Sequence, residues 1–239
     1  MAEVTVVGGG LAGMVTALRL LERGFEVSLY DESEMRLGGK AGSNKNGERF
    51  NDHGYHIFPA WYVNTWELVK ELGIESNFVD FSDVTQLKAG EFPRFITIRD
   101  PLSLRYAWRN LKSGLMPIPD MLLFFYAVLD LASQPYRRRW PLDRLSVTGF
   151  LRSRFYRTPE LETQFQELVL KAITVPSYAV SAMTVRNVVR FWIRSPQPFV
   201  SILRNNLQTY FIEPIHQRLR VLGCDIHLAQ RLKRIQTDG

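Results

Sequence analysis

The sequence predicts an α/β fold that begins with a βαβ unit and is interrupted by a mostly helical segment. Residues 4–7 form a short β-branched run, which is typical of a buried parallel strand. Residues 11–23 then place apolar side chains at helical spacing, and Gly24 stands where a helix end favours left-handed backbone geometry. Residues 25–30 form a second strand-like run, so the unit has the length of about thirty residues expected of one βαβ unit.

The pattern changes after Pro101 and becomes mostly helical. The clearest expected helices cover residues 146–154, 160–172 and 181–193. We therefore expect an α/β domain formed by residues 1–100 and 207–239, with residues 101–206 inserted as a helical domain.

The last stretch predicts one helix and one hairpin. Residues 207–222 have the periodicity of a helix, and Pro214 would kink that helix. Residues 224–228 and 232–235 alternate like the two strands of a β-hairpin.

Composition excludes several classes of protein. The 239 residues are 46% hydrophobic and 23% charged, which is ordinary for a globular chain and unlike a disordered one. Cys224 is the single cysteine, so no intramolecular disulfide forms. One cysteine and four histidines give no metal-ligand spacing, and we expect no metal site.

The net charge of +6 leaves the kind of partner open. Basic clusters, one of them at residues 137–139, fit either an anionic lipid surface or an ordinary solvated face. No nucleic-acid-binding motif is present, so we expect no nucleic-acid partner.

The sequence favours a cytoplasmic location with peripheral membrane contact. It shows no secretory signal, and its longest apolar run, residues 121–129, is half of the roughly 18 residues that span a bilayer. Residues 121–131 predict either a buried helix or a helix that dips into lipid, since aromatic and basic side chains flank them.

Gly8, Gly10 and Gly13 form a G-x-G-x-x-G motif between the first strand and its helix. Gly8 permits a tight turn, Gly10 allows the backbone to approach a pyrophosphate, and Gly13 allows helix and strand to pack closely. Leu11 and Ala12 complete the helix N-terminus, whose N–H groups attract phosphate. The motif in this context predicts a dinucleotide site.

Asp31 and Glu32 end the second strand, about twenty residues after the glycines, where a carboxylate accepts hydrogen bonds from ribose hydroxyls. We prefer Asp31 because it closes the strand. A carboxylate there disfavours the 2′-phosphate of NADP, but the motif does not distinguish NAD from FAD.

A second glycine cluster, Gly38-Gly39-Lys40, follows this acidic end. It resembles the Gly-Gly-Arg or Gly-Gly-Lys pair of the flavin-dependent amine oxidase and phytoene (carotenoid) desaturase superfamily. The resemblance implies FAD as cofactor, with Gly38, Gly39 and Lys40 along its pyrophosphate. The spacing from Asp31 to Gly38 is one residue longer than usual in that family.

Residues 50–58 resemble the phytoene desaturase branch, which implies that Gly54, Tyr55 and His56 line the flavin. His56 has three possible roles: it contacts the flavin edge, it transfers a proton, or it supports the loop by packing. We prefer the flavin contact or the packing role to proton transfer, because flavin chemistry often needs no protein base. The catalytic residues stay unknown.

The middle of the chain and its closing hairpin also resemble this branch and the hydroxysqualene dehydroxylases. In such proteins the hairpin rejoins the flavin domain, which implies that a backbone group near Leu232 contacts adenine. A C-terminal segment that completes the family's fold has no match here, so the chain resembles an N-terminal half that a C-terminal half would complement.

The resemblance implies an FAD-dependent oxidoreductase that dehydrogenates a hydrophobic isoprenoid such as a carotenoid, with hydride passing to flavin N5. The alternatives are a flavin amine oxidase, an NAD-binding module and a non-catalytic dinucleotide-binding scaffold.

Overall fold

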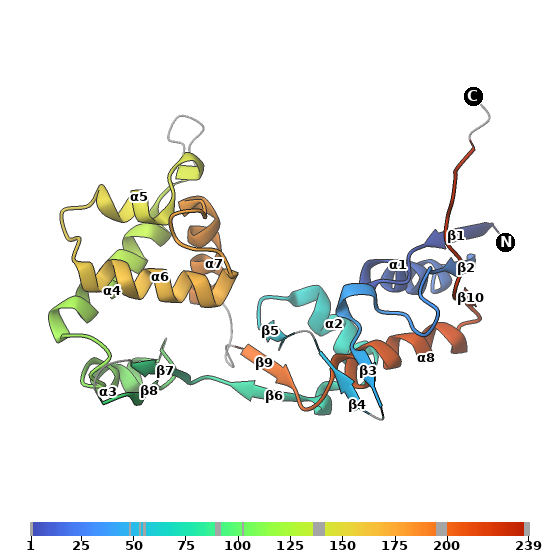
Figure 1. Ribbon diagram of the computed structural model, residues 1–239, viewed down its shortest axis with the longest axis horizontal. Coiled ribbons are helices and arrows are strands. Elements are labelled where there is room, and N and C mark those ends of the chain that lie inside the picture. The colour runs from blue at the N-terminus through green and yellow to red at the C-terminus, as the bar shows by residue number, and fades with distance from the viewer. Residues whose placement is uncertain are drawn as a thin grey trace. The chain divides into compact units, whose positions relative to one another are not determined.

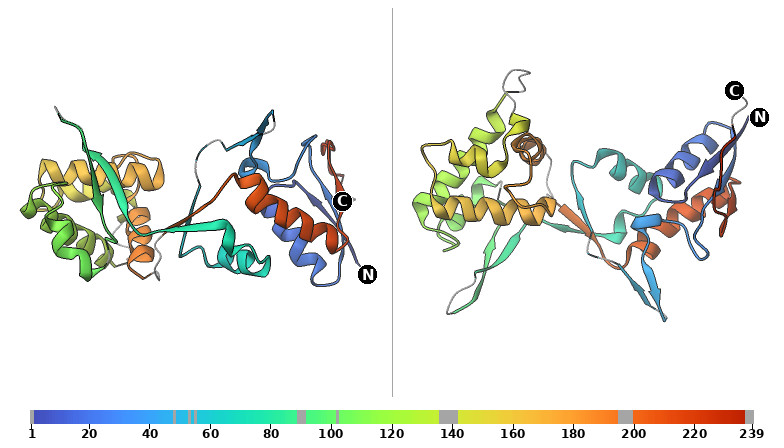
Figure 2. Two further views of the ribbon diagram at one scale, coloured as in Figure 1. Left: turned by 90° about the horizontal axis from the view of Figure 1, so that it is seen from below. Right: turned by 45° about the horizontal axis from the view of Figure 1, so that its top comes forward.

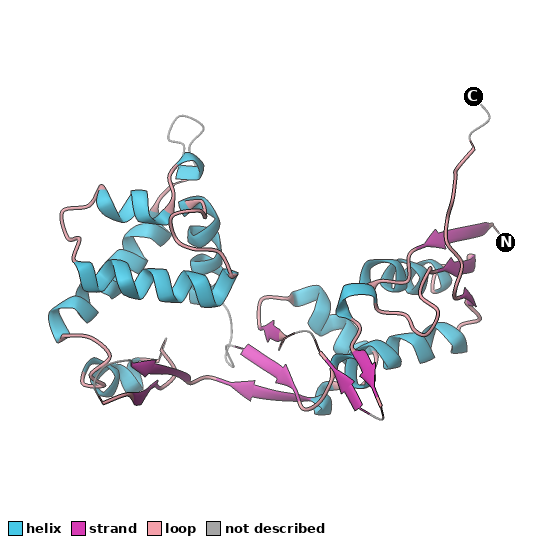
Figure 3. Cartoon of the chain, in the orientation of Figure 1, coloured by secondary structure: helices cyan, strands magenta, loops and turns pink. Residues whose placement is uncertain are grey.

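A computed structural model shows two compact units (Figures 1 and 3). It describes residues 2–47, 49–52, 54, 56–88, 92–101, 103–135, 142–194 and 200–236. Unit 1 combines Met1–Phe81 with Val200–Gly239, and unit 2 comprises Ser82–Phe199.

Unit 1 contains the predicted βαβ unit. Strand β1 (Glu3–Val7) leads into helix α1 (Leu11–Leu21) and strand β2 (Glu26–Tyr30), which pairs with β1 in parallel. Gly24, at φ +83°, ends the helix as expected. A later strand, β10 (Asp225–His227), adds to β2 in parallel, so the sheet order is β1-β2-β10.

One face of this sheet packs against helices and the other is exposed. Val27 and Leu29 of β2 are buried with Met14 and Leu18 of α1. Helix α8 (Glu213–Val221) lies beside α1 and joins the same core (Figure 2). Val7, on the opposite face, is 51% exposed. The strand at β1 is therefore half-buried, whereas its β-branched run predicted burial on both faces.

The remaining elements of unit 1 are short. Strands β3 (Asn44–Asn46) and β4 (Arg49–Asn51) form a hairpin, and β9 (Val200–Leu203) pairs antiparallel with both β5 (Ile57–Pro59) and β6 (Phe78–Phe81). Helix α2 (Val63–Glu71) buries Leu68 and Val69 in the core, and a π-helical turn (Gln208–Ile212) precedes α8.

Unit 2 is mostly helical. A two-stranded hairpin, β7 (Val84–Lys88) and β8 (Arg94–Ile98), comes first (Figure 2). The helices are α3 (Ala107–Leu111), α4 (Ile118–Ser133), α5 (Val147–Arg152), α6 (Pro159–Ile173) and α7 (Ala182–Arg194). The three helices predicted in this part of the chain are thus confirmed, and their ends lie within two residues of the expected ones.

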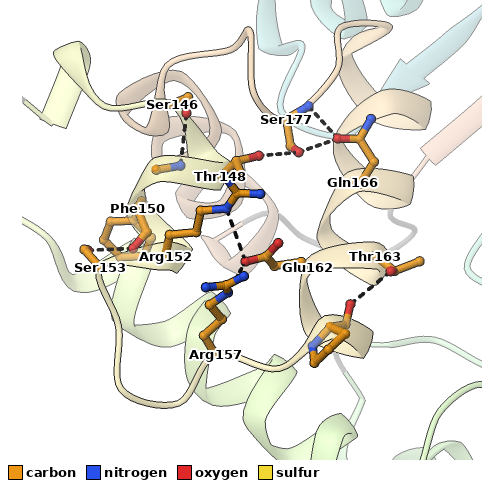
Figure 4. A network of polar contacts seen from close by, with 12 residues as sticks. Ser146, Thr148, Phe150, Arg152, Ser153, Arg157, Glu162, Thr163, Gln166 and Ser177 are labelled. Atoms are coloured by element: carbon orange, nitrogen blue, oxygen red, sulfur yellow. Dashed lines mark hydrogen bonds and ion pairs between the residues drawn. The ribbon is translucent and has the colours of Figure 1, made fainter.

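A polar network supports the core of unit 2 around Phe150 and Phe165 (Figure 4). The Ser177 amide donates to Gln166 Oε1 at 2.9 Å, and the Thr148 and Ser177 hydroxyls lie 2.9 Å apart. Glu162 of α6 forms ion pairs with the guanidinium groups of both Arg152 and Arg157. These contacts fasten α5 to α6.

Helix α4 is buried along one face only. Met121, Ala127 and Leu131 are buried. The opposite face exposes an apolar stripe at helical spacing, consisting of Ile118, Leu122, Phe125, Tyr126 and Leu129. Among the described residues, no helix is long and apolar enough to cross a membrane.

The predicted closing hairpin is wrong. Only its first strand exists, as β10, and the described residues that follow it, up to 236, form no strand. The chain turns at Ala229 (φ +56°), and the Gln230 amide donates to the Asp31 carbonyl. Pairing with β2 therefore replaces pairing within a hairpin.

The compact units also end at other residues than the expected domains. The β7–β8 hairpin belongs to unit 2 instead of residues 1–100, and β9 belongs to unit 1 because it pairs with β5 and β6. The functional role of each stretch stays a prediction.

Candidate dinucleotide-binding site

The candidate site lies where β1 ends and α1 begins. Gly8 adopts φ +100°, and its amide donates to the Tyr30 carbonyl at 2.7 Å, which holds the turn against the end of β2. A non-glycine residue would strain this backbone conformation. Gly8 therefore makes the tight turn that the motif predicted.

The N-terminus of α1 is open to an anion. Gly10 is its N-cap, with no side-chain cap and no acidic residue in the first turn. Leu11 and Ala12 begin that first turn, whose N–H groups have no partner within the helix. A helix start without a carboxylate cap carries partial positive charge, which favours phosphate.

Gly10 and Gly13 differ in what surrounds them. A Cβ on Gly10 would meet no atom within 4 Å, so its side opens into free space. A Cβ on Gly13 would lie 1.8 Å from the Gly8 carbonyl oxygen. Gly13 thus allows the close packing of α1 on the turn, and Gly10 leaves room for a ligand.

The second glycine turn lies against the first. Gly38 and Gly39 adopt φ +118° and +53°. The Gly38 amide donates to the Gly9 carbonyl at 2.8 Å, and a Cβ on Gly39 would lie 3.1 Å from Gly10 Cα. Lys40 follows on a short 3₁₀ turn and is exposed, which leaves its ammonium group available to a phosphate.

Asp31, and not Glu32, lies against the glycine turn. Asp31 Oδ2 accepts from the Gly9 amide at 2.6 Å, and Oδ1 accepts from the Ser33 amide at 2.8 Å. Glu32 is exposed and forms an ion pair with Arg231 at 3.5 Å. Each carboxylate oxygen of Asp31 keeps a second lone pair, so it is able to accept a hydrogen bond from a ribose hydroxyl as well.

The other predicted site residues lie in two further segments. Gly54, exposed, and His56, half-buried, stand between β4 and β5, whereas Tyr55 lies outside the described residues. Leu232 is 50% exposed in the segment that follows β10. Whether these residues contact a cofactor stays a prediction.

Sequence reasoning missed a polar link that holds the helical segment after β9. Asp52 accepts from the Leu207 amide at 3.2 Å with both carboxylate oxygens, and Ser43 accepts from the Gln208 amide at 2.9 Å while donating to Asp52. These two side chains satisfy amides at a helix start. Asp52 thus has a structural role in the segment that the resemblance placed beside the flavin.

The one cysteine of the sequence, Cys224, is buried in the core of unit 1. Burial, helped by the neighbouring charge of Asp225, raises the pKa of Cys224 to about 11, so the thiol is unreactive near neutral pH. Among the described residues, no three histidine, cysteine or acidic side chains are grouped to bind a metal.

Two glycine turns, an open helix start and an acidic strand end together define a dinucleotide-binding domain. Residues 6–72 match the family model described as an NAD(P)-binding Rossmann-like domain. The zeta-carotene desaturase of Synechocystis sp. is 25% identical over 98% of this chain and 50% of its own length. That of Capsicum annuum is 43% identical over 32% of this chain and 13% of its own.

Solved structures share the fold. An oxidoreductase from Methanosarcina mazei superimposes with a TM-score of 0.68 at 17% identity, over 95% of this chain and 51% of its own. A putrescine oxidase superimposes with a TM-score of 0.64 at 16% identity, over 95% and 51%.

Nearly the whole chain is thus similar to a carotene desaturase, and it shares its fold with oxidoreductases of known structure. It spans about half the length of the Synechocystis zeta-carotene desaturase.

Proposed function

We propose that the chain supplies the dinucleotide-binding part of an FAD-dependent oxidoreductase that dehydrogenates a hydrophobic isoprenoid such as a carotenoid. The observation that carries the proposal is the hydrogen bond from the Gly38 amide to the Gly9 carbonyl. It brings both glycine turns to one helix start, beside Asp31.

The second turn is the reason for preferring FAD to NAD. A Rossmann unit with one glycine motif serves either cofactor. Here Gly39 lies against Gly10, and Lys40 adds a cation beside the helix start. The similarity to carotene desaturases supports the same choice, because Gly38-Gly39-Lys40 resembles the second glycine turn of the superfamily that contains these desaturases.

Each predicted residue has a defined task in this proposal. The backbone amides at the start of α1 bind the pyrophosphate, and Lys40 neutralises part of its charge. Asp31 accepts hydrogen bonds from the ribose hydroxyls. Gly54, Tyr55 and His56 line the flavin. When bound, FAD supplies a hydride acceptor at N5, which allows an allylic C–H bond to be oxidised without a protein base.

An apolar cavity in unit 2 supports a hydrophobic substrate. It has a volume of about 180 Å³, and apolar side chains of the β7–β8 hairpin, α4 and α7 line most of it. They include Val84, Ile98, Met121, Phe124, Val128 and Trp192. Ligand pockets usually measure roughly 300–1,000 Å³, so this cavity fits one end of a long ligand.

Anaerobic reduction of the flavin tests the proposed reaction. The FAD-loaded chain, alone and together with a C-terminal half of a carotene desaturase, is mixed with a polyene or with putrescine. Bleaching of the oxidised flavin spectrum by the polyene alone supports the proposal.

The same experiment decides between the alternatives. Bleaching by the amine alone favours an amine oxidase, for which the structural similarity to putrescine oxidase is the supporting observation. Bleaching by neither, with FAD retained, favours a non-catalytic binding protein.

We also propose that the exposed stripe of α4 contacts a lipid bilayer. Its five apolar side chains, from Ile118 to Leu129, face solvent on one side of a helix whose other side is packed. A helix with this division suits an interface between water and lipid. A polyene substrate would then reach the enzyme without crossing water.

A further inference from the structure

Three arginines follow one another along α7 at intervals of four residues. Arg186, Arg190 and Arg194 therefore lie on one side of the helix, about one turn apart. Like charges at this spacing repel one another, so the row is destabilising unless an anion offsets it.

Arg186 is the buried member of the row. It is 6% exposed, and its Nε donates to the Gln134 carbonyl while Nη1 donates to Asn187 Oδ1 at 2.9 Å. Both partners are neutral. A buried charge normally has a counter-ion, because hydrogen bonds to neutral groups do not replace the solvation it loses.

No carboxylate of the described residues supplies that counter-ion. None forms an ion pair with Arg186, Arg190 or Arg194. The two neighbouring stretches outside the described residues, 136–141 and 195–199, contain no aspartate or glutamate in their sequence. Burial lowers the pKa of Arg186, and the charges of Arg190 and Arg194 lower it further, with no acidic group acting in the other direction.

The row borders a cavity. A cavity of about 220 Å³ is lined by Arg186, Asn187, Arg190, Phe191 and Arg194. Three of the five residues that border it are therefore arginines. Guanidinium groups present donors in a planar fork that matches the oxygens of a phosphate.

We propose that this cavity binds a phosphate-type anion, either a free phosphate or diphosphate group or the headgroup of a phospholipid. The described residues that line this cavity all belong to unit 2, whereas both glycine turns belong to unit 1. Three arginines that border one cavity favour phosphate over a singly charged carboxylate. The inference does not depend on the proposed function.

Titration calorimetry of the full chain with inorganic diphosphate, and separately with phosphate, tests the soluble source. The double variant Arg190→Gln, Arg194→Gln changes half-buried Arg190 and exposed Arg194 and spares buried Arg186, so it should fold. The control Arg218→Gln, Arg220→Gln removes the same charge from the exposed side of α8. We expect saturable binding that the first variant weakens by about tenfold or more and the control leaves within about twofold.

Vesicle sedimentation tests the lipid source. Vesicles of phosphatidylcholine, with and without phosphatidic acid, are mixed with the same three proteins. Binding that requires phosphatidic acid and is lost in the α7 variant only, without binding of free diphosphate, assigns the site to a headgroup.

Two results would overturn the proposal. In one, neither diphosphate nor phosphatidic acid binds. In the other, the α8 control weakens binding as much as the α7 variant does, which would show a general effect of net charge and no site at α7.

Discussion

Gly10 and Gly13 of the first glycine motif are glycines for different physical reasons. At Gly13 any side chain collides with the Gly8 carbonyl, so the position is required for folding. At Gly10 the backbone has φ −68° and ψ 173°, which every L-residue adopts, and the space beside it is empty. The fold therefore does not require glycine at position 10, which agrees with the proposed approach of a ligand to this residue.

We predict that Gly10→Val leaves the protein folded but abolishes dinucleotide binding. Its cost in stability should not exceed about 1 kcal/mol, because valine is a poorer N-cap than glycine. Gly13→Ala should cost about 3 kcal/mol, at the upper end for overpacking. Chemical denaturation measures both variants, and FAD titration follows for any that folds. A Gly10→Val protein that binds FAD like the wild type would refute the assigned role.

At the scale of elements, α4 illustrates why an apolar helix does not have to be buried. The sequence allowed either a buried helix or one that dips into lipid. In the structure, Phe124 packs on Phe165 with ring centroids 5.0 Å apart, whereas Leu122 and Leu129 are 54% and 61% exposed. Substitutions on the exposed stripe therefore test lipid contact without opening the core.

We predict that Leu122→Asp together with Leu129→Asp reduces flotation with liposomes severalfold. Each change should alter stability by no more than about 0.5 kcal/mol, because both side chains are exposed. The control pair, Leu170→Asp and Val221→Asp, places two aspartates at exposed apolar positions outside α4. If the α4 variant floats with liposomes as the wild type does, the stripe does not contact lipid, and a protein partner such as a C-terminal half would have to cover it.

Local signals predicted the elements that depend on neighbours in the chain. The βαβ unit and both glycine turns were predicted because strand composition, helical spacing and glycine positions are all local. Pro214 was expected to kink a helix, and in the structure it is the second residue of α8, directly after the π-helical turn of residues 208–212.

Contacts between distant residues could not be predicted from one sequence. The predicted hairpin at residues 224–235 failed because β10 pairs with β2, a strand about 200 residues earlier in the chain. The link from Asp52 to Leu207 joins residues 155 positions apart. No pattern near either residue indicates such a partner.

At the scale of the whole molecule, the nucleotide site belongs entirely to unit 1 and the apolar cavity to unit 2. Parallel sheets are normally covered on both faces, whereas the β1-β2-β10 sheet exposes one. The relatives are about twice as long as this chain. Cofactor binding is therefore the direct test of unit 1.

Retention of FAD by the purified chain is measured most directly by its visible absorption spectrum after incubation with FAD and removal of the excess. We predict a retained flavin spectrum in the wild type and none in Gly10→Val. A folded wild-type chain that retains no FAD, and whose melting temperature rises with NAD instead, would contradict this prediction.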